Sequence, residues 1–290
     1  MNLLYLTFGN SASIHMQAAF SICSFLSNPS ASGSVNVITD NKKYYTHLGS
    51  RVNLIDITKE ELLDWRGPHD FFWRIKIKAI EKICALYPGE AVMYLDTDTF
   101  LYGDAIRLAE QLKKGHALMH ENEGALSAKK SKTEKKMWQQ IAGKSFGKLS
   151  MVATDCMWNA GVVATPNTLG GAECQLALDI CDEMCSSGVT KRLIEQYALS
   201  LALSNSYGIH EACSLIAHYW STKEIWNKRL NDFFIEAYFS QWNIDKLIEQ
   251  TRAMDTTDLP IYQRIKNTRL RLTDLITRAF PAKNIQYLTK

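Results

Sequence analysis

The chain has 290 residues, of which 46% are hydrophobic, and a formal net charge of +3 at pH 7. This length and composition suit one large α/β domain with a smaller appendage, and so weak a positive charge argues against nucleic acid as a partner. Seven cysteines stand as singletons without the spacing of a zinc site, and no apolar run reaches the ~20 residues of a membrane-spanning helix, so we expect a cytoplasmic protein with buried free thiols.

The first part of the chain alternates predicted strands with predicted helices. Hydrophobic patterning predicts strands at 3–8, 35–39 and 52–57, helices at 14–26, 42–48 and 71–86, and a further strand that ends at Leu95. Such alternation favours a mostly parallel sheet flanked by helices, whose ligands bind at the carboxyl ends of the strands. Thr7 and Asp40 stand at two such ends, so we expect them to share one cleft with the acids that follow Leu95.

Two aspartates directly follow the strand that ends at Leu95. Residues 92–101 read Val-Met-Tyr-Leu-Asp-Thr-Asp-Thr-Phe-Leu. If the backbone stays extended through Thr97, Asp96 and Asp98 point to the same side and repel each other unless a cation lies between them. Oxygen ligands suit Mg²⁺ or Mn²⁺, which keep open positions for substrate phosphates. The alternative is a solvated turn, which the apolar flanks on both sides disfavour.

Further polar residues stand at element boundaries later in the chain. Asn159 and Gly161 precede an apolar strand, and helices are predicted at 173–186 and 190–204. Glu195 and Gln196 lie near the start of the second of these helices, and His218 lies in the segment 209–220. Each of these residues has an ordinary structural explanation when it is taken alone. Only their order along the chain indicates a function.

That order resembles the GT-A glycosyltransferases, and most closely the family of bacterial lipooligosaccharide galactosyltransferases and glycogenin. The matching motifs are Tyr94-Leu95-Asp96-Thr97-Asp98, Trp158-Asn159-Ala160-Gly161, Glu195-Gln196, and His218-Tyr219 followed by Lys223. The resemblance covers roughly residues 1–225. Two features depart from the family pattern: Glu195 replaces an aspartate, and the spacing from His218 to Lys223 is one residue short and lacks the usual glycine.

The resemblance implies a role for each matching residue. Asp96, Asp98 and His218 would hold Mn²⁺ or Mg²⁺ against the diphosphate of a nucleotide-sugar, and a lysine cation would add to the neutralisation of charge on the leaving group. Glu195 and Gln196 would face the donor sugar and the reaction centre. The expected nucleotide-sugar contacts are Thr7, Asp40, Asp96, Asn159, Gly161, Lys223 and one of Arg74 and Lys78.

Other interpretations of the same residues stay open. Arg74 and Lys78 could belong to a solvated basic helix face with Lys76 and Lys82, and Glu195-Gln196 could be an ordinary amphipathic helix start. The Asp96-Thr-Asp98 motif also resembles the nucleophile motif of haloacid-dehalogenase-like phosphohydrolases. A third alternative is a non-catalytic sugar-binding protein.

We therefore predict a GT-A, Rossmann-like α/β fold with a helical C-terminal extension. Residues 1–225 would form the catalytic domain and 226–290 a helical, basic extension. The expected activity is metal-dependent hexosyl transfer from a nucleotide-sugar, most simply a UDP-sugar, to a saccharide or lipid-linked acceptor. Residues 261–290 combine seven basic residues with apolar residues near helical spacing. This pattern suits peripheral contact with the anionic inner face of the cell membrane, or packing on the catalytic domain.

Overall fold

The computed structural model describes the chain except residues 29–32, 264–271, 273–274, 277 and 281–290. Its centre is a seven-stranded sheet in the order β12-β6-β11-β4-β1-β2-β3. The strands are β1 (Asn2–Thr7), β2 (Val35–Thr39), β3 (Asn53–Asp56), β4 (Val92–Leu95), β6 (Ala117–Met119), β11 (Val162–Thr165) and β12 (Ile209–Glu211). Pairing is parallel except at β11, which runs antiparallel to both β4 and β6. The predicted mixed, mainly parallel sheet is confirmed.

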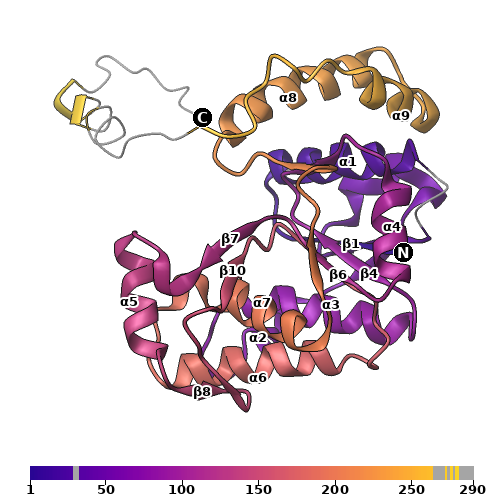
Figure 1. Ribbon diagram of the computed structural model, residues 1–290. Helices are drawn as coiled ribbons and strands as arrows, with labels where there is room; N and C mark the ends of the chain where they lie inside the picture. The colour runs from indigo at the N-terminus through magenta and orange to yellow at the C-terminus, as the bar shows by residue number, and fades with distance from the viewer. Residues whose placement is uncertain (29–32, 264–271, 273–274, 277, 281–290) are drawn as a thin grey trace.

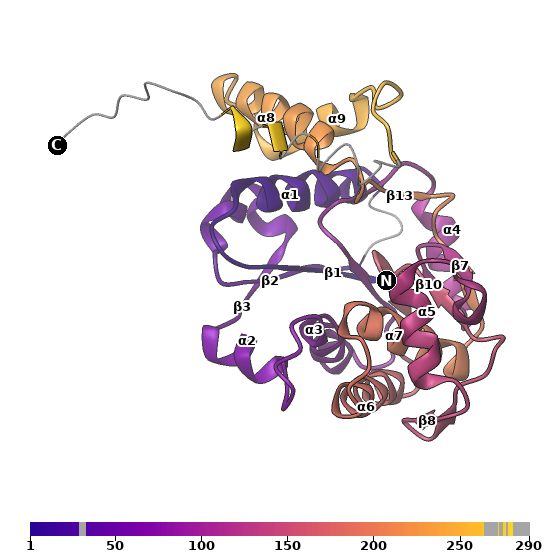
Figure 2. The same cartoon turned by 90° about the vertical axis from the view of Figure 1, so that its left-hand side faces the viewer.

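Helices cover both faces of this sheet, as Figures 1 and 2 show from two directions. One face carries α3 (Arg74–Leu86), α6 (Ala172–Ser186) and α7 (Ile194–Ser206), and the other carries α1 (Ala12–Leu26) beneath α8 (Lys223–Phe239) and α9 (Ile244–Ala253). The remaining helical segments are η1 (Lys42–Arg51), α2 (Lys59–Trp65), α4 (Ala105–Lys113), η2 (Leu126–Ala128), α5 (Lys132–Ile141) and η3 (Lys191–Leu193).

Strand β1 explains how two cores form on a single sheet. Its side chains alternate faces, so Leu4 and Leu6 join the core under α3, α6 and α7, while Leu3 and Tyr5 join the core under α1. All six residues of β1 are buried, as expected for a strand that is covered on both faces. This central strand ends at Thr7, which places the end of β1 beside the segment that follows β4.

Three two-stranded ribbons complete the described part of the fold. They pair β5 (Thr99–Leu101) with β13 (Ile216–His218), β7 (Asn122–Ala125) with β10 (Cys156–Trp158), and β8 (Ser145–Phe146) with β9 (Leu149–Ser150). The first of these ribbons positions the site, because its register sets His218 opposite Thr99, one residue after Asp98. Residues about 120 apart in the sequence are thereby joined.

Two predicted helices begin later than their hydrophobic pattern indicates. The helix expected over 71–86 begins at Arg74, because Phe71 to Trp73 form turns, with the Phe71 amide donating to the Arg66 carbonyl. The helix expected over 190–204 begins at Ile194, after the 3₁₀ turn η3. In both cases an apolar residue before the helix, Phe71 or Leu193, is at least partly buried and continues the hydrophobic pattern, so periodicity alone does not separate the turn from the helix.

The predicted boundary between residues 225 and 226 falls within helix α8. Trp226 and Leu230 of this helix are fully buried in the core that also contains Phe20 and Phe100. The division into two domains stays a prediction. Most of the predicted basic helix over 261–290 lies outside the described residues. Within the described part of the chain, no helix is both long and apolar enough to cross a membrane.

Candidate active site

Asp96 and Asp98 lie in the turn that follows β4, as the sequence predicts. The turn is closed by the Thr99 amide and the Thr99 hydroxyl, both of which donate to the Asp96 carbonyl, at 3.2 and 2.8 Å. The Asp96 amide donates to the Gly161 carbonyl at 2.8 Å, which fixes the turn to the start of β11. The carboxylates of Asp96 and Asp98 and a ring nitrogen of His218 all lie within 4.8 Å of one another. Three residues from two distant parts of the chain therefore form one potential metal site.

His218 is oriented by Asn159, and this contact defines which ring nitrogen faces the carboxylates. The side-chain oxygen of Asn159 accepts from the Gly161 amide at 3.0 Å, while its amide nitrogen donates to Glu123 at 3.1 Å. The oxygen of Asn159 therefore faces Nδ1 of His218, 3.1 Å away, and Nδ1 must carry the proton that it donates. Nε2, the other ring nitrogen, is directed at the Asp98 carboxylate 3.4 Å away.

Gly161 is required by the position of the His218 ring. A Cβ atom at residue 161 would lie 2.2 Å from Cε1 of His218, closer than any real contact. The backbone of β11 and the imidazole therefore pack against each other with no room for a side chain. This contact accounts for glycine after Asn159-Ala160 in the sequence, and both predicted residues of that motif lie at the site.

Each aspartate also faces a lysine. Lys223, at the first position of α8, places its ammonium group 3.0 Å from the Asp98 carboxylate. Burial alone would raise the pKa of Asp98, but the hydrogen bond and charge of His218 and the charge of Lys223 outweigh it, and the pKa is lowered. On the other side, Lys76 lies 3.3 Å from Asp96, and the Tyr94 hydroxyl donates to the same carboxylate at 2.9 Å.

Lys76 is a site residue that the sequence interpretation assigned to a solvated helix face. It is buried, its ammonium group lies 3.1 Å from Glu195, and it donates to the Ala160 carbonyl at 3.0 Å. Burial alone would lower the pKa of Lys76, but the charges of Asp96 and then Glu195 outweigh it and raise the pKa. The signal was present in the sequence, because Lys76, Ile80 and Ile83 follow the i, i+4, i+7 spacing of the buried face of α3.

Glu195 and Gln196 lie at the start of α7, behind Lys76. The Glu195 carboxylate is buried against the Lys76 ammonium, and burial raises the pKa of Glu195 more than this charge lowers it. Gln196 is half-buried, and its backbone carbonyl accepts from the Ser200 hydroxyl. Glu195 is thus linked to Asp96 by Lys76, whose ammonium group contacts both carboxylates.

Arg74 and Lys78 lie on α3 but do not line the cleft beside the aspartates. Arg74 forms a bidentate ion pair with Asp182 of α6, at 2.7 and 2.9 Å. Lys78 pairs with Glu81 on its own helix. Both cations are therefore engaged on the side of α3 away from Lys76.

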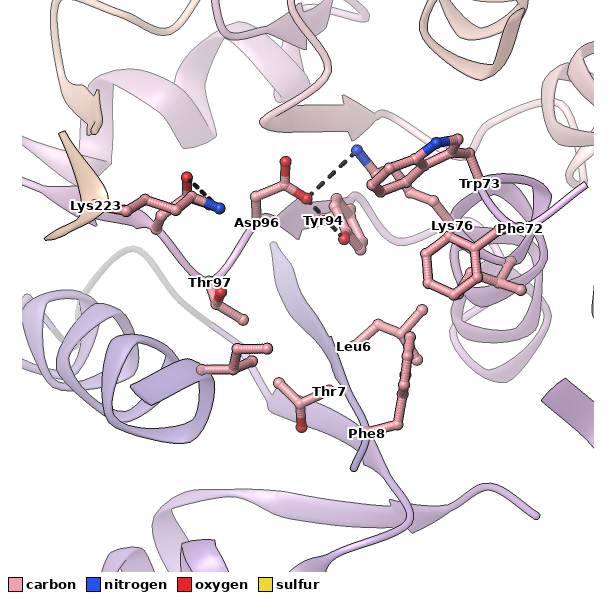
Figure 3. A pocket seen from close by; sticks show the side chains of 13 residues that line it. Leu6, Thr7, Phe8, Phe72, Trp73, Lys76, Tyr94, Asp96, Thr97 and Lys223 are labelled. Atoms are coloured by element: carbon pink, nitrogen blue, oxygen red, sulfur yellow. Dashed lines mark hydrogen bonds and ion pairs between the residues drawn. The ribbon is translucent and has the colours of Figure 1, made fainter. Parts of the chain in front are cut away.

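The cleft beside the aspartates is walled by the ends of β1 and β4 and the first turn of α3. Thr7 lines it, and its hydroxyl accepts from Tyr45 at 2.9 Å. Phe8, Phe72 and Trp73 add an aromatic wall, with Trp73 about half exposed (Figure 3). Asp40 stands at the end of β2, exposed, and accepts from the Gly9 amide at 2.9 Å. It is near the end of β1 but is not part of the cleft wall.

No protein-family model matches this sequence, and neither does any curated protein. Mouse xyloside xylosyltransferase 1 in its apo form is similar in structure, with 11% identity over 73% of this chain and 85% of that chain and a TM-score of 0.46. The galactosyltransferase LgtC, in complex with donor and acceptor sugar analogs, is 14% identical over 90% of this chain and 98% of that chain, with a TM-score of 0.45. The apo-form glycosyltransferase GlyE of Streptococcus pneumoniae is 15% identical over 86% of this chain and 62% of that chain, with a TM-score of 0.48.

All three neighbours are glycosyltransferases, at TM-scores below 0.5 and identities of 11–15%. The chemistry of this protein has to be inferred from its own side chains.

Proposed function

We propose that this protein is a metal-dependent glycosyltransferase that moves a sugar from a nucleotide-sugar, most simply a UDP-hexose, to a saccharide or lipid-linked acceptor. The observation that carries the proposal is the meeting of Asp96, Asp98 and Nε2 of His218 at the carboxyl ends of the central strands. Ligand sites of α/β sheets lie at this edge.

The donor atoms fit a divalent cation such as Mn²⁺ or Mg²⁺. Oδ2 of Asp98 is buried, with the Lys223 ammonium 3.0 Å and Nε2 of His218 3.4 Å away. Carboxylate oxygens and an imidazole nitrogen that converge in this way can share a divalent cation. Two carboxylate oxygens and one imidazole nitrogen are suitable ligands for Mn²⁺, and the Asn159 contact that orients His218 is typical of a metal-bound histidine.

A bound cation would neutralise negative charge that develops on the departing diphosphate. The chain supplies further positive charge from Lys223, whose ammonium group is close enough to Asp98 to meet the same phosphates. Lys76 stays protonated and forms ion pairs with Asp96 and Glu195, which fix both carboxylates beside the cleft. We place Glu195 and Gln196 near the donor sugar, Thr7, Asp40, Asn159 and Gly161 around the nucleotide-sugar, and the aromatic wall against a base or a sugar ring.

A phosphohydrolase that uses Asp96 as nucleophile and Asp98 as acid is the second candidate from the sequence. The surroundings of Asp98 disfavour it, because a carboxyl whose pKa is lowered by His218 and Lys223 is a poor proton donor near neutral pH. Oδ1 of Asp96 accepts a hydrogen bond from Tyr94 and pairs with the Lys76 ammonium, so this oxygen is not free to act as a nucleophile. Sugar binding without catalysis is the third candidate, and it predicts no nucleotide-sugar turnover.

A thermal-shift experiment separates these activities. We expect UDP to raise the melting temperature only when Mn²⁺ or Mg²⁺ is present, and phosphate monoesters to leave it unchanged. Asp96→Asn and Asp98→Asn should abolish both this shift and nucleotide-sugar turnover while the far-ultraviolet circular dichroism is retained. Turnover that is unaffected in both folded variants would refute the metal assignment.

The location of the protein belongs to the same proposal. We infer a cytoplasmic enzyme whose basic segment 261–290 contacts the anionic inner face of the cell membrane, where a lipid-linked acceptor would be found. The support is the sequence of that segment, with seven basic residues and one acid.

A further inference from the structure

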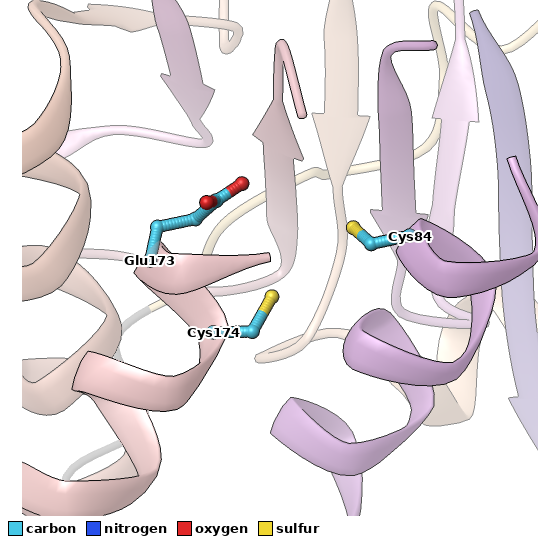
Figure 4. Close-up of side chains that lie close together, drawn as sticks. All are labelled: Cys84, Glu173 and Cys174. Atoms are coloured by element: carbon cyan, nitrogen blue, oxygen red, sulfur yellow. The ribbon is translucent and has the colours of Figure 1, made fainter. Parts of the chain in front are cut away.

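Two thiols and a carboxylate meet at the end of the sheet opposite the candidate active site. Cys84 comes from the last turns of α3, and Glu173 and Cys174 from the first turn of α6. Figure 4 shows the Cys84 thiol directed across the gap toward α6. One ligand atom from each of the three residues lies within 4.8 Å of the other two. All three side chains are at least 97% buried.

The carboxylate of Glu173 lacks a counter-charge. Its Oε1 accepts from the Thr165 hydroxyl at 2.5 Å, but its Oε2 is buried without any hydrogen-bond partner. Among the described residues, no lysine, arginine or histidine forms an ion pair with Glu173. A buried carboxylate is costly unless it is protonated, paired with a cation or bound to a metal. A cation between Oε2 and the two thiols would resolve this imbalance.

Asn167, which is hydrogen-bonded to Thr165 and Cys84, supplies, after Glu173, a second side-chain oxygen without a hydrogen-bond partner. Its side-chain nitrogen donates to the carbonyls of Cys84 and Tyr87, at 3.0 and 2.8 Å, which fixes the identity of the amide atoms. Its backbone amide donates at 3.0 Å to the Thr165 hydroxyl that bonds Glu173. The side-chain oxygen of Asn167 is buried and has no partner.

We propose that Cys84, Cys174 and Glu173 bind a thiophilic divalent cation of the Zn²⁺ class, with the Asn167 oxygen as the candidate fourth ligand. Thiolate sulfur selects Zn²⁺ over Mg²⁺ and Mn²⁺, so this site differs in metal preference from the oxygen and nitrogen ligands of the active site. Glu173 and Cys174 both lie in the first turn of a 15-residue helix, where the helix dipole favours negative groups.

Cys84 and Cys174 are both free, buried thiols. Coordination replaces the S–H bonds by two metal–sulfur bonds, and the two protons leave to solvent. Because the ligands come from α3 and α6, the bound cation would tie these two helices together beneath the sheet and stabilise the fold.

Cobalt substitution of the full-length chain tests the site. Co²⁺ bound by thiolates shows a sulfur-to-metal charge-transfer absorption that the active-site ligands, which contain no sulfur, cannot give. We expect this absorption in the wild-type chain and in Asp98→Asn, and its loss in Cys84→Ser and Cys174→Ser. Cys23→Ser is the matched control, since Cys23 is equally buried but lies in the core on the opposite face of the sheet.

A second variant keeps the proposal falsifiable if the serine variants do not fold. Glu173→Gln preserves shape and removes the charge, and we expect it to weaken Co²⁺ or Zn²⁺ binding at the sulfur site at least 10-fold. No sulfur absorption in the wild type, unchanged affinity in Glu173→Gln, or a Cys84–Cys174 disulfide in the purified chain would each overturn the proposal. All of these measurements are independent of sugar transfer, so the proposed enzymatic activity could fail while this site stands.

Discussion

Lys76 of α3 and Glu195 of α7 form a buried ion pair of 3.1 Å, and the same ammonium group reaches Asp96 at 3.3 Å. One buried cation thus compensates two carboxylates from different elements. The pair joins the acid–Gln motif of α7 to the Asp-x-Asp turn, although the two motifs are about 100 residues apart.

Replacing Lys76 by methionine should be strongly destabilising. The substitution leaves the buried Glu195 without its ion-pair partner and the part-exposed Asp96 with only the Tyr94 hydroxyl. Removal of one member of a buried pair typically costs about 3–5 kcal/mol of the free energy of unfolding. Urea denaturation measures the effect. Lys78→Met is the matched control on the same helix, because Lys78 pairs with the more exposed Glu81 and should cost at most about 1 kcal/mol. Similar losses in the two variants would contradict this account of Lys76.

Replacing Gly161 by alanine should displace His218 from the proposed metal site. The new Cβ would lie 2.2 Å from the imidazole, so the ring must turn away from Asp98. We expect Mn²⁺ affinity, measured by calorimetry, to fall at least 10-fold while the protein stays folded. Gly208→Ala is the control, because a Cβ there meets only His116 at an ordinary 3.6 Å. If Mn²⁺ affinity is retained in Gly161→Ala, His218 is not a ligand.

Substitutions at the start of α7 should affect turnover more than nucleotide affinity. Gln196→Ala and Glu195→Gln alter groups that we place near the donor sugar rather than the diphosphate. We expect kcat to fall by at least 10-fold, with UDP affinity changed less than about threefold. Steady-state kinetics at saturating donor, together with UDP titrations, give both quantities. A normal kcat with weakened UDP binding would mean that these residues contact the nucleotide.

The lowered pKa of Asp98 has a consequence for acid stability. A carboxyl whose folded-state pKa lies below its unfolded value of 3.8 stabilises the protein fully above that pH, and the stabilisation declines as the pH falls toward the folded-state pKa. The difference in unfolding free energy between wild type and Asp98→Asn should shrink by about 1 kcal/mol between pH 5 and pH 3. Urea denaturation in chelating buffer measures it. A difference that stays constant over this range would show that Asp98 is not stabilised in its charged form.

Truncation tests the proposed membrane contact of the basic C-terminal segment. The cut should follow Gln263, because the Pro260 carbonyl accepts from Thr222 and Trp226 and the Gln263 amide donates to Ser221. We expect the full chain, but not the truncated one, to co-sediment with anionic liposomes at low salt, and high salt to release it. Equal sedimentation of the two proteins would exclude a membrane role for residues 264–290.

The positions of Asp96, Asp98, Asn159, Gly161 and His218 could be predicted from the sequence because each stands at a strand end or in a short motif. The site around them depends on tertiary pairing. The ribbon of β5 and β13 brings His218 to Asp98, and no local pattern announces such a pairing. For the same reason Cys84 and Cys174, 90 residues apart, show no metal-ligand spacing in the sequence.

The basic residues of α3 show where the sequence interpretation stopped short. Three cations alternate along Arg74, Lys76 and Lys78, and charge alone does not distinguish them. Their acidic partners distinguish them. Arg74 pairs with Asp182 and Lys78 pairs with Glu81, so of these three cations only Lys76 faces the aspartates. A lysine in phase with the isoleucines of a buried helix face is the feature that marks such a residue beforehand.

Under the proposed function, the two lysines beside the aspartates bear on the order in which the metal ion and the sugar donor bind. Lys76 and Lys223 hold Asp96 and Asp98 near electrical neutrality before any divalent ion arrives. The charge balance of this site therefore does not need a divalent ion, so we expect the resting protein to bind one only weakly at Asp96 and Asp98. The diphosphate of the donor adds negative charge, which makes binding of a divalent cation favourable. We therefore expect the cation and the donor to bind to the free protein together.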